Sequence, residues 1–315
     1  MASYYTNDTI DNIDTNISLR FPSNLGLPSV SSQHLMLKLD IVLCVIYSFF
    51  TLTAILTNSV VIIAIWKTKP LRSPSITLLC FLAITDLLTG LIVGPAFITS
   101  SVFRIKLSPS ILAGRISVAS SYTASTLSLL TLTLISLDKA SALYFHLRYK
   151  QVVRNGAVCV AQCISAVFCC SITVARVLKP SYIFEILDFL ILSICLSTNV
   201  LVYCYIFRII RREENNLKYE RKTAARINNQ GHINVRRHKK SSITMASLTV
   251  LSIVCFVANF VAKLFTTKGQ VSFVTLIALD FSDTALFVVA TINPLCYSYR
   301  LSNVRNAVAS VCKLR

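Results

Sequence analysis

The 315-residue chain is 54% hydrophobic and only 14% charged, with a formal net charge of +18. This composition excludes an ordinary soluble domain and favours a membrane protein. A basic chain can also bind nucleic acid, but here the charge flanks apolar segments, so no nucleic-acid partner is expected.

Seven apolar stretches follow one another along the chain. Each covers about 20 residues or more, the length at which a helix crosses a bilayer core ~30 Å thick. Because lipid offers no hydrogen-bond partners, only helices satisfy every backbone group within one such stretch. We therefore predict an all-α membrane protein, a seven-transmembrane helix bundle. Its spans lie near residues 41–66, 74–102, 116–137, 156–175, 189–207, 241–262 and 271–299.

The basic residues predict which side of the membrane each connection faces. With the amino terminus outside, 22 of the 31 Lys and Arg fall on the inner side, eleven of them between Arg208 and Lys240. Since cytoplasmic loops are enriched in Lys and Arg, the amino terminus is expected outside. The basic inner segment is predicted to extend the fifth and sixth helices around a flexible centre.

The amino-terminal tail, residues 1–36, agrees with this orientation. It is rich in Ser, Asn and Thr and lacks the apolar core of a signal peptide. It carries two glycosylation sequons, at Asn7 and Asn16. Such sites are modified only on the lumenal side, so an extracellular glycosylated tail is expected. No cysteine lies in a predicted outer loop, and no extracellular disulfide is expected.

The bundle is predicted to cover residues 37–299, followed by an amphipathic helix and a cytoplasmic tail at 300–315. Cys312 closes this basic, amphipathic stretch, which has the pattern of a helix lying along the inner leaflet. Palmitoylation of Cys312 and an unmodified thiol both remain open.

Polar residues inside the predicted spans point to function. Asp86 lies deep in the second span, where a carboxylate costs several kcal/mol unless it is hydrated, protonated or paired. It is expected to face the bundle interior, either as a functional group or as a protonated acid in an interhelical hydrogen bond. Asn58 in the first span and Asn293 in the seventh are its natural partners, and Pro294 predicts a bend in the seventh helix.

Four motifs on four helices carry a family resemblance. They are Leu56-Thr57-Asn58-Ser59-Val60, Leu82-Ala83-Ile84-Thr85-Asp86-Leu87, Leu137-Asp138-Lys139-Ala140 and Asn293-Pro294-Leu295-Cys296-Tyr297. In this order and spacing, the chain resembles the rhodopsin-like (class A) G-protein-coupled receptors over about residues 37–315. Its second inner loop and its missing disulfide cysteine make it most similar to the melanocortin/adenosine-like cluster.

The resemblance implies a buried site for an allosteric sodium ion, and no other cofactor. Asp86, Ser128 and Asn293 would hold the ion, with Asn58 beside them. A cation would offset the cost of the buried carboxylate and favour the resting packing of the helices.

At the inner end the resemblance implies a second set of switch residues. Asp138 and Lys139 would form a lock, and Tyr203 and Tyr297 would move toward the bundle on activation. The sixth helix, with Phe256 as its aromatic toggle, would then tilt out to admit a heterotrimeric G protein. The protein would be a multi-pass receptor of the plasma membrane and not an enzyme. The basic third inner segment fits contact with either the G protein or membrane lipid.

Departures from the family motifs leave a rival interpretation open. Lys139 replaces the family's arginine, Phe256 replaces its tryptophan, and Ala258 replaces the proline of the sixth helix. Lysine lacks the planar fork of arginine, so we expect it to differ from arginine in restraining the resting receptor or in coupling to the G protein. A receptor that no longer signals, acting as a decoy or partner subunit, is the main alternative. A membrane channel or transporter is the weaker one.

The extracellular ligand is not identified by the sequence. Ser121 stands at the third-helix position where amine receptors carry aspartate, which disfavours a monoamine. Asp280 and Asp283 are three residues apart and share a helical face. They either contact a cationic ligand or pair with a basic side chain, Lys263 or Arg176. The ligand-contact candidates are Ser121, Asp188, Lys263, Asp280 and Asp283.

Overall fold

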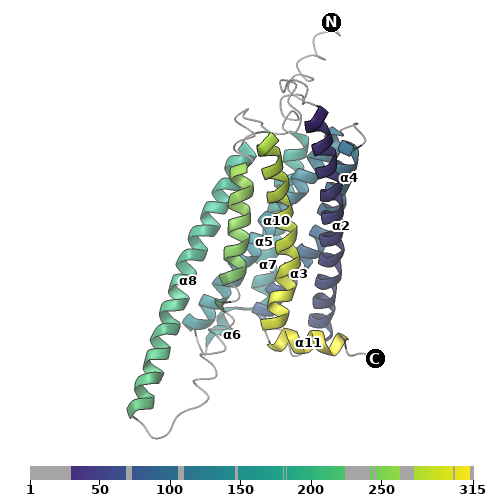
Figure 1. The fold of residues 1–315 in the computed structure, drawn as a ribbon. Coiled ribbons are helices and arrows are strands. Elements are labelled where there is room, and N and C mark those ends of the chain that lie inside the picture. Colours follow the sequence, from purple (N-terminus) through teal and green to yellow (C-terminus); the bar gives the residue numbers. More distant parts are fainter. Residues whose placement is uncertain are drawn as a thin grey trace.

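The computed structural model describes residues 30–68, 73–105, 110–145, 148–179, 181, 183–223, 242–243, 246–262, 273–300 and 302–312. These residues are almost entirely helical, and no strand occurs among them. The long helices run side by side as a bundle, and a short helix lies across one end (Figure 1).

The helices follow the predicted order along the chain. Their bounds are α2 Val30–Lys67, α3 Pro74–Leu88, η2 Thr89–Val93, α4 Gly94–Ile105, α5 Ile111–Phe145, α6 Tyr149–Val152, α7 Asn155–Leu178, α8 Ile183–Thr223, α10 Phe273–Arg300 and α11 Ser302–Cys312. Between α8 and α10 lies a further helix, Ala246–Ala262. The element η2 is a π-helical turn that joins α3 to α4 without a break.

Membrane-crossing length is reached by most of these helices. Within the described residues, six helices are long and apolar enough to span a bilayer, and Ala246–Ala262 is a shorter apolar helix at the place of the predicted sixth span. The predicted all-α membrane bundle with a short helix after its last span is therefore confirmed. The side of the membrane that each end faces stays a prediction.

The outer surface of the bundle has the character of a lipid-facing surface. On α2, Val45, Phe49, Leu52 and Leu56 recur at helical spacing and are 62–66% exposed. Apolar side chains so exposed and so regularly placed need an apolar solvent, which a bilayer supplies. The ten cysteines whose side chains the structure describes are all free thiols.

The two ends of the bundle have separate cores. At the end near α11, the buried hydroxyl-bearing rings of Tyr203 and Tyr297 pack among aliphatic side chains such as Leu82 and Leu132. Toward the other end, the rings of Tyr47, Phe97 and Phe287 meet in pairs with centroids 5.3–5.6 Å apart. The polar site described below lies between α3, α5 and α10, of which α5 and α10 contribute to both cores.

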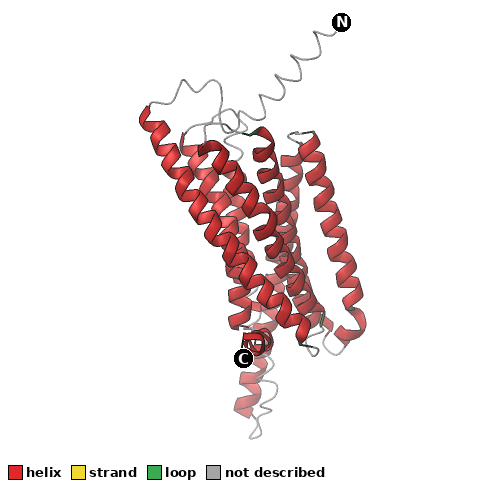
Figure 2. Cartoon of the chain, turned by 90° about the vertical axis from the view of Figure 1, so that its right-hand side faces the viewer, coloured by secondary structure: helices red, strands yellow, loops and turns green. Residues whose placement is uncertain are grey.

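The segment after the last span forms the predicted amphipathic helix. Its buried Ala307 packs with Ala64 of α2 and Ile76 of α3, which fixes α11 across the end of the bundle. Figure 2 shows α11 nearly end-on beneath the long helices. The predicted extension of the fifth helix is also present, because α8 continues to Thr223, well beyond the bundle (Figure 1).

Two glycines allow α2 to approach the π-helical turn closely. A Cβ atom added to Gly94 would lie 2.1 Å from Oγ1 of Thr51, and one added to Gly90 would lie 2.8 Å from Cγ1 of Ile55. Small residues four apart are the usual means of bringing two membrane helices into contact. The turn precedes Pro95, whose missing N–H removes one regular helical hydrogen bond. The glycines therefore fix the position of the helix that carries Asp86.

We expect Gly94→Ala to destabilise the bundle, because its new methyl group has no space beside Thr51. Overpacking of this kind costs ~1–3 kcal/mol, which would lower the Tm of the purified protein in detergent by several degrees. Gly114→Ala is the matched control, since nothing lies within 4 Å of a Cβ atom there. Equal Tm values for the two variants would contradict this account of the contact.

Candidate functional site: a buried carboxylate below a side-chain cavity

Asp86 is the centre of a polar joint between three helices. Its side chain on α3 is 1% exposed. Nδ2 of Asn293, on α10, donates to one carboxylate oxygen at 2.9 Å, and the hydroxyl of Ser128, on α5, donates to the other at 3.2 Å. The structure thus brings together the three residues that the sequence proposed for one site. These hydrogen bonds offset part of the cost of burying the carboxylate.

Asn58 ties α2 to the same region. Its Nδ2 donates to the carbonyl oxygens of Ala54 at 2.9 Å and Ala290 at 3.3 Å. The side-chain oxygens of Asn58 and Asn293, Oδ1 in each residue, have no partner among the described residues. A carboxylate with neutral oxygens nearby is the donor set that a small hard cation prefers. The residues present therefore fit the sodium ion that the resemblance implies.

Two cavities meet above Asp86. The first contains Asp86 and Ser128 and extends along α5. The second is lined from α5, α8, α10 and the helix Ala246–Ala262 and offers about 440 Å³ of space, including its open side. The residues common to both linings are Ser121, Ser125, Phe256 and Leu286. Phe256, the predicted toggle, therefore borders both cavities. A molecule in the second cavity would contact a side chain that also lines the space around Asp86.

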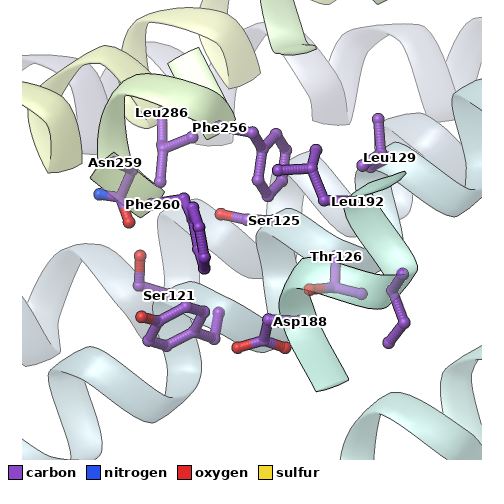
Figure 3. A pocket seen from close by; sticks show the side chains of 12 residues that line it. Ser121, Ser125, Thr126, Leu129, Asp188, Leu192, Phe256, Asn259, Phe260 and Leu286 are labelled. Atoms are coloured by element: carbon purple, nitrogen blue, oxygen red, sulfur yellow. The ribbon is translucent and has the colours of Figure 1, made fainter. Parts of the chain in front are cut away.

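The second cavity combines apolar walls with a few polar groups (Figure 3). This is the usual composition of small-molecule sites. The apolar part is formed by Leu129, Ile191, Leu192, Phe256, Phe260 and Leu286, and the polar part by Ser121, Ser125, Thr126, Asp188 and Asn259, with Tyr122 beside them. Ser121 and Asp188, two of the five predicted ligand contacts, are among these residues.

An ion pair closes one side of this cavity. The Arg176 guanidinium, at the end of α7, donates to Asp188 of α8 at 2.5 Å and to the carbonyl oxygen of Phe184 at 3.2 Å. Its carbon lies 4.0 Å from the ring centroid of Tyr122, an attractive cation–π geometry. Both charged side chains are 12% exposed. Of the two basic partners that the sequence proposed for Asp280 and Asp283, Arg176 instead pairs with Asp188.

The acids of α10 occupy different environments. Asp283 is 2% exposed and accepts a hydrogen bond of 2.7 Å from Asn259, whereas Asp280 is only half-buried. Asp283 is thus more deeply buried than Asp188, whose side chain is 12% exposed. Lys263, Asn7 and Asn16 lie outside the described residues, as does the side chain of Cys312.

At the opposite end of the bundle, Asp138 binds neighbouring helices. It is 5% exposed and accepts hydrogen bonds from Ser75 of α3 and Tyr149 of α6. Burial, together with this hydrogen bond to Asp138, raises the pKa of the Tyr149 hydroxyl. Lys139 is half-buried on the next position of α5. The sequence did not identify Ser75 and Tyr149 as partners, because their positions relative to Asp138 depend on the folded loop.

Tyr203 joins three helices through hydroxyl groups. Its Oη accepts from Ser136 of α5 at 3.0 Å and lies 3.4 Å from Thr249 of the helix Ala246–Ala262. Asn199 continues this polar chain, since it accepts from Ser136 at 2.6 Å and donates to Thr133 at 2.8 Å. Asn199 was not among the residues predicted from the sequence, although an asparagine inside an apolar helix is a usable signal.

Tyr297 lies close to this chain but is not hydrogen-bonded within it. The ring is fully buried on α10, and its hydroxyl has no partner among the described residues. A buried hydroxyl without a hydrogen bond costs ~1–3 kcal/mol relative to a satisfied one. The group would therefore gain by moving to a polar partner in another packing of the helices.

Comparison with known proteins agrees with this geometry. The family profile described as "7 transmembrane receptor (rhodopsin family)" matches residues 57–179, which contain Asn58, Asp86, Ser128 and Asp138. The chain is 23% identical to "Cannabinoid receptor 1" of Xenopus laevis over 337 residues, covering 96% of this chain and 68% of that receptor. It is 36% identical to "5-hydroxytryptamine receptor 1D" of Rattus norvegicus over 137 residues, covering 44% of this chain and 36% of that receptor.

We expect Arg176→Ala to destabilise the protein, because it removes the cation that pairs with the largely buried carboxylate of Asp188. Removing one member of a buried ion pair costs ~3 kcal/mol or more. The purified variant should unfold at a lower temperature, and adding Asp188→Asn should restore part of the loss. Lys179→Ala, three residues further on and exposed, is the control. Additive effects of the two substitutions would show that the pair is not coupled.

Proposed function

We propose that the chain, whose residues 57–179 match the rhodopsin-family receptor profile, is a plasma-membrane receptor of that family that converts ligand binding into activation of a heterotrimeric G protein. The ligand would enter the cavity beside Asp188, at the end of the bundle away from α11. With the amino terminus outside, that end faces the exterior.

The lining residues that the two cavities share are the observation that supports this function best. A ligand against Phe256 or Leu286 would press on side chains that also border the space around Asp86. The Asp86 joint connects α3, α5 and α10, so a small shift there changes how three helices pack. A ligand can favour one packing only if it binds the two packings with different affinity.

A sodium ion held by Asp86, Ser128 and Asn293 would stabilise the resting packing. When bound, it supplies the positive charge that a buried carboxylate lacks. The chain's own contribution is an oriented set of oxygens. The Asn293 amide donates its N–H to Asp86, and among the described residues its oxygen has no partner. Asn58 holds α2 against the backbone of α10 beside this set.

The inner end would report the change to the G protein. Opening would move the helix Ala246–Ala262 away from α8, which requires the contact of 3.4 Å between Tyr203 of α8 and Thr249 to break. Tyr203 and Tyr297, both in the same core, would then gain new partners on the inner side. Asp138 and Lys139 would lie at the mouth that this movement creates, where the replacement of arginine by Lys139 would change how strongly the resting packing is restrained.

A non-signalling receptor is the second candidate. It is favoured by Lys139, Phe256 and Ala258, because each replaces a residue with different hydrogen-bonding or backbone properties. Such a protein would bind ligand in the same cavity without opening its inner end.

We expect cells that express the chain to give a response, basal or evoked by one member of a peptide, nucleoside and lipid library, in a panel of G-protein reporters. Lys139→Ala should abolish this response while surface expression is kept, because the cationic side chain lies beside the predicted G-protein contact. Asp40→Asn, at the far end of α2, is the control for a charge change. Ligand binding with no output from any reporter would favour the non-signalling receptor.

We expect sodium to stabilise the purified wild-type protein. Replacing choline by sodium at constant ionic strength should raise its Tm by a few degrees, as mass action predicts for a ligand of the folded state. Asp86→Asn should remove this response, because the amide carries no charge to attract the ion. Asp40→Asn should retain it. The same sodium response in Asp86→Asn as in the wild type would exclude Asp86 as the ion's ligand.

A further inference from the structure

One polar group on the wall of the ligand cavity has a fixed orientation. Asn259, on the helix Ala246–Ala262, is 4% exposed and lines the cavity. Its Nδ2 donates two hydrogen bonds to α10, one to the hydroxyl oxygen of Ser282 at 3.1 Å and one to the Asp283 carboxylate at 2.7 Å.

Both partners of this amide act as acceptors, which decides which way it faces. The hydroxyl hydrogen of Ser282 is given to the carbonyl oxygen of Leu279 at 2.8 Å, so Ser282 offers Asn259 only its lone pairs. The carboxylate of Asp283, when ionised, also only accepts. A flipped amide would place its oxygen against two acceptors and lose both hydrogen bonds. The amide nitrogen therefore faces α10, and the oxygen is left for the cavity.

The cavity side of Asn259 has the surroundings of a polar contact for a ligand. In the view of Figure 3 the amide oxygen is turned toward Ser121 of α5, and the nitrogen is turned away. Ser121 is 4% exposed and lines both cavities. The rest of this wall is apolar, formed by Phe256, Phe260 and Leu286.

We infer that Asp283 is a positioning residue that turns the Asn259 carbonyl oxygen into the cavity and so selects ligands that donate a hydrogen bond there. The ligand class is a flat or compact apolar molecule that carries an N–H or O–H group directed at Asn259. A ligand that offers only acceptors at this point would leave two buried oxygens facing each other, at a cost comparable to a lost hydrogen bond. The inference rests on the proposed function only in placing the ligand in this cavity.

A purely structural role for Asn259 would account for the contacts with α10 alone. Two hydrogen bonds between neighbouring helices stabilise the bundle whatever fills the cavity. That role makes no difference to which probe the cavity binds. Ligand preference therefore distinguishes the two interpretations.

The test compares two probes that differ in one donor, 5-fluoroindole and 5-fluoro-1-methylindole. Binding to the purified full-length protein in lipid nanodiscs is followed by fluorine NMR, with empty nanodiscs subtracting partition into lipid. We expect the wild type to bind the N–H probe about tenfold more tightly, the value of one hydrogen bond in a desolvated site. In Asp283→Asn the new amide can donate to Asn259, which frees its amide to turn, and the preference should fall to about twofold or less.

Controls separate this inference from folding and from signalling. Thr284→Val, next to Asp283, removes a hydroxyl that, among the described residues, is bonded to the backbone oxygen of Asp280, and it should keep the wild-type preference. If Asp283→Asn does not fold, Asn259→Leu removes the acceptor itself and should also abolish the preference. The assay contains no G protein, so a receptor that does not signal can still show the preference for the N–H probe.

Three results would overturn the inference. They are equal binding of the two probes to the wild type, no binding of the N–H probe to the wild type, and an unchanged preference in the folded variants at Asp283 or Asn259.

Discussion

The carboxylate of Asp86 is the constraint on which the rest of the bundle depends. An acid at this depth in a membrane helix is stable only if protein groups replace the water that it has lost. Ser128 and Asn293 supply hydrogen bonds from α5 and α10, and these two contacts hold three helices at one point. The close approach of α2 to the π-helical turn at Gly90 and Gly94 keeps α3 in the position that these contacts require.

Polar contacts within the apolar bundle also explain how a change in helix packing at one site can alter the packing at another. The interhelical contacts form a sparse chain, with Asp86 in the middle, Asn259 and Asp283 toward the cavity, and Tyr203 toward the inner end. Each contact joins two helices, and among the described residues Oδ1 of Asn293 and the hydroxyl of Tyr297 are buried without a partner that another arrangement could supply. A bundle of this kind has a small number of alternative packings rather than a continuous range.

Much of the fold was predictable from the sequence because lipid imposes simple rules. Length and hydropathy identified the spans, and the cost of a buried carboxylate was sufficient to turn Asp86 toward Asn293. The pairing of Arg176 with Asp188 was not predicted, since it depends on the turn between α7 and α8. The orientation of Asn259 was also beyond the sequence, because it follows from where Ser282 sends its hydrogen. The period of apolar residues shows which face of a helix is buried, whereas the direction of a hydrogen bond can be assigned only from atomic positions.

The most direct test of the central claim is a double-mutant cycle between Asp86 and Asn293, measured as thermal unfolding of the purified protein. Asn293→Asp alone places two carboxyl groups against each other and should lower stability strongly. Adding Asp86→Asn restores a carboxylate–amide pair, so the double variant should be more stable than Asn293→Asp by more than about 1 kcal/mol. If Asp86→Asn has the same effect in both backgrounds, the two residues are not coupled, and the joint between α3 and α10 is not what holds this bundle.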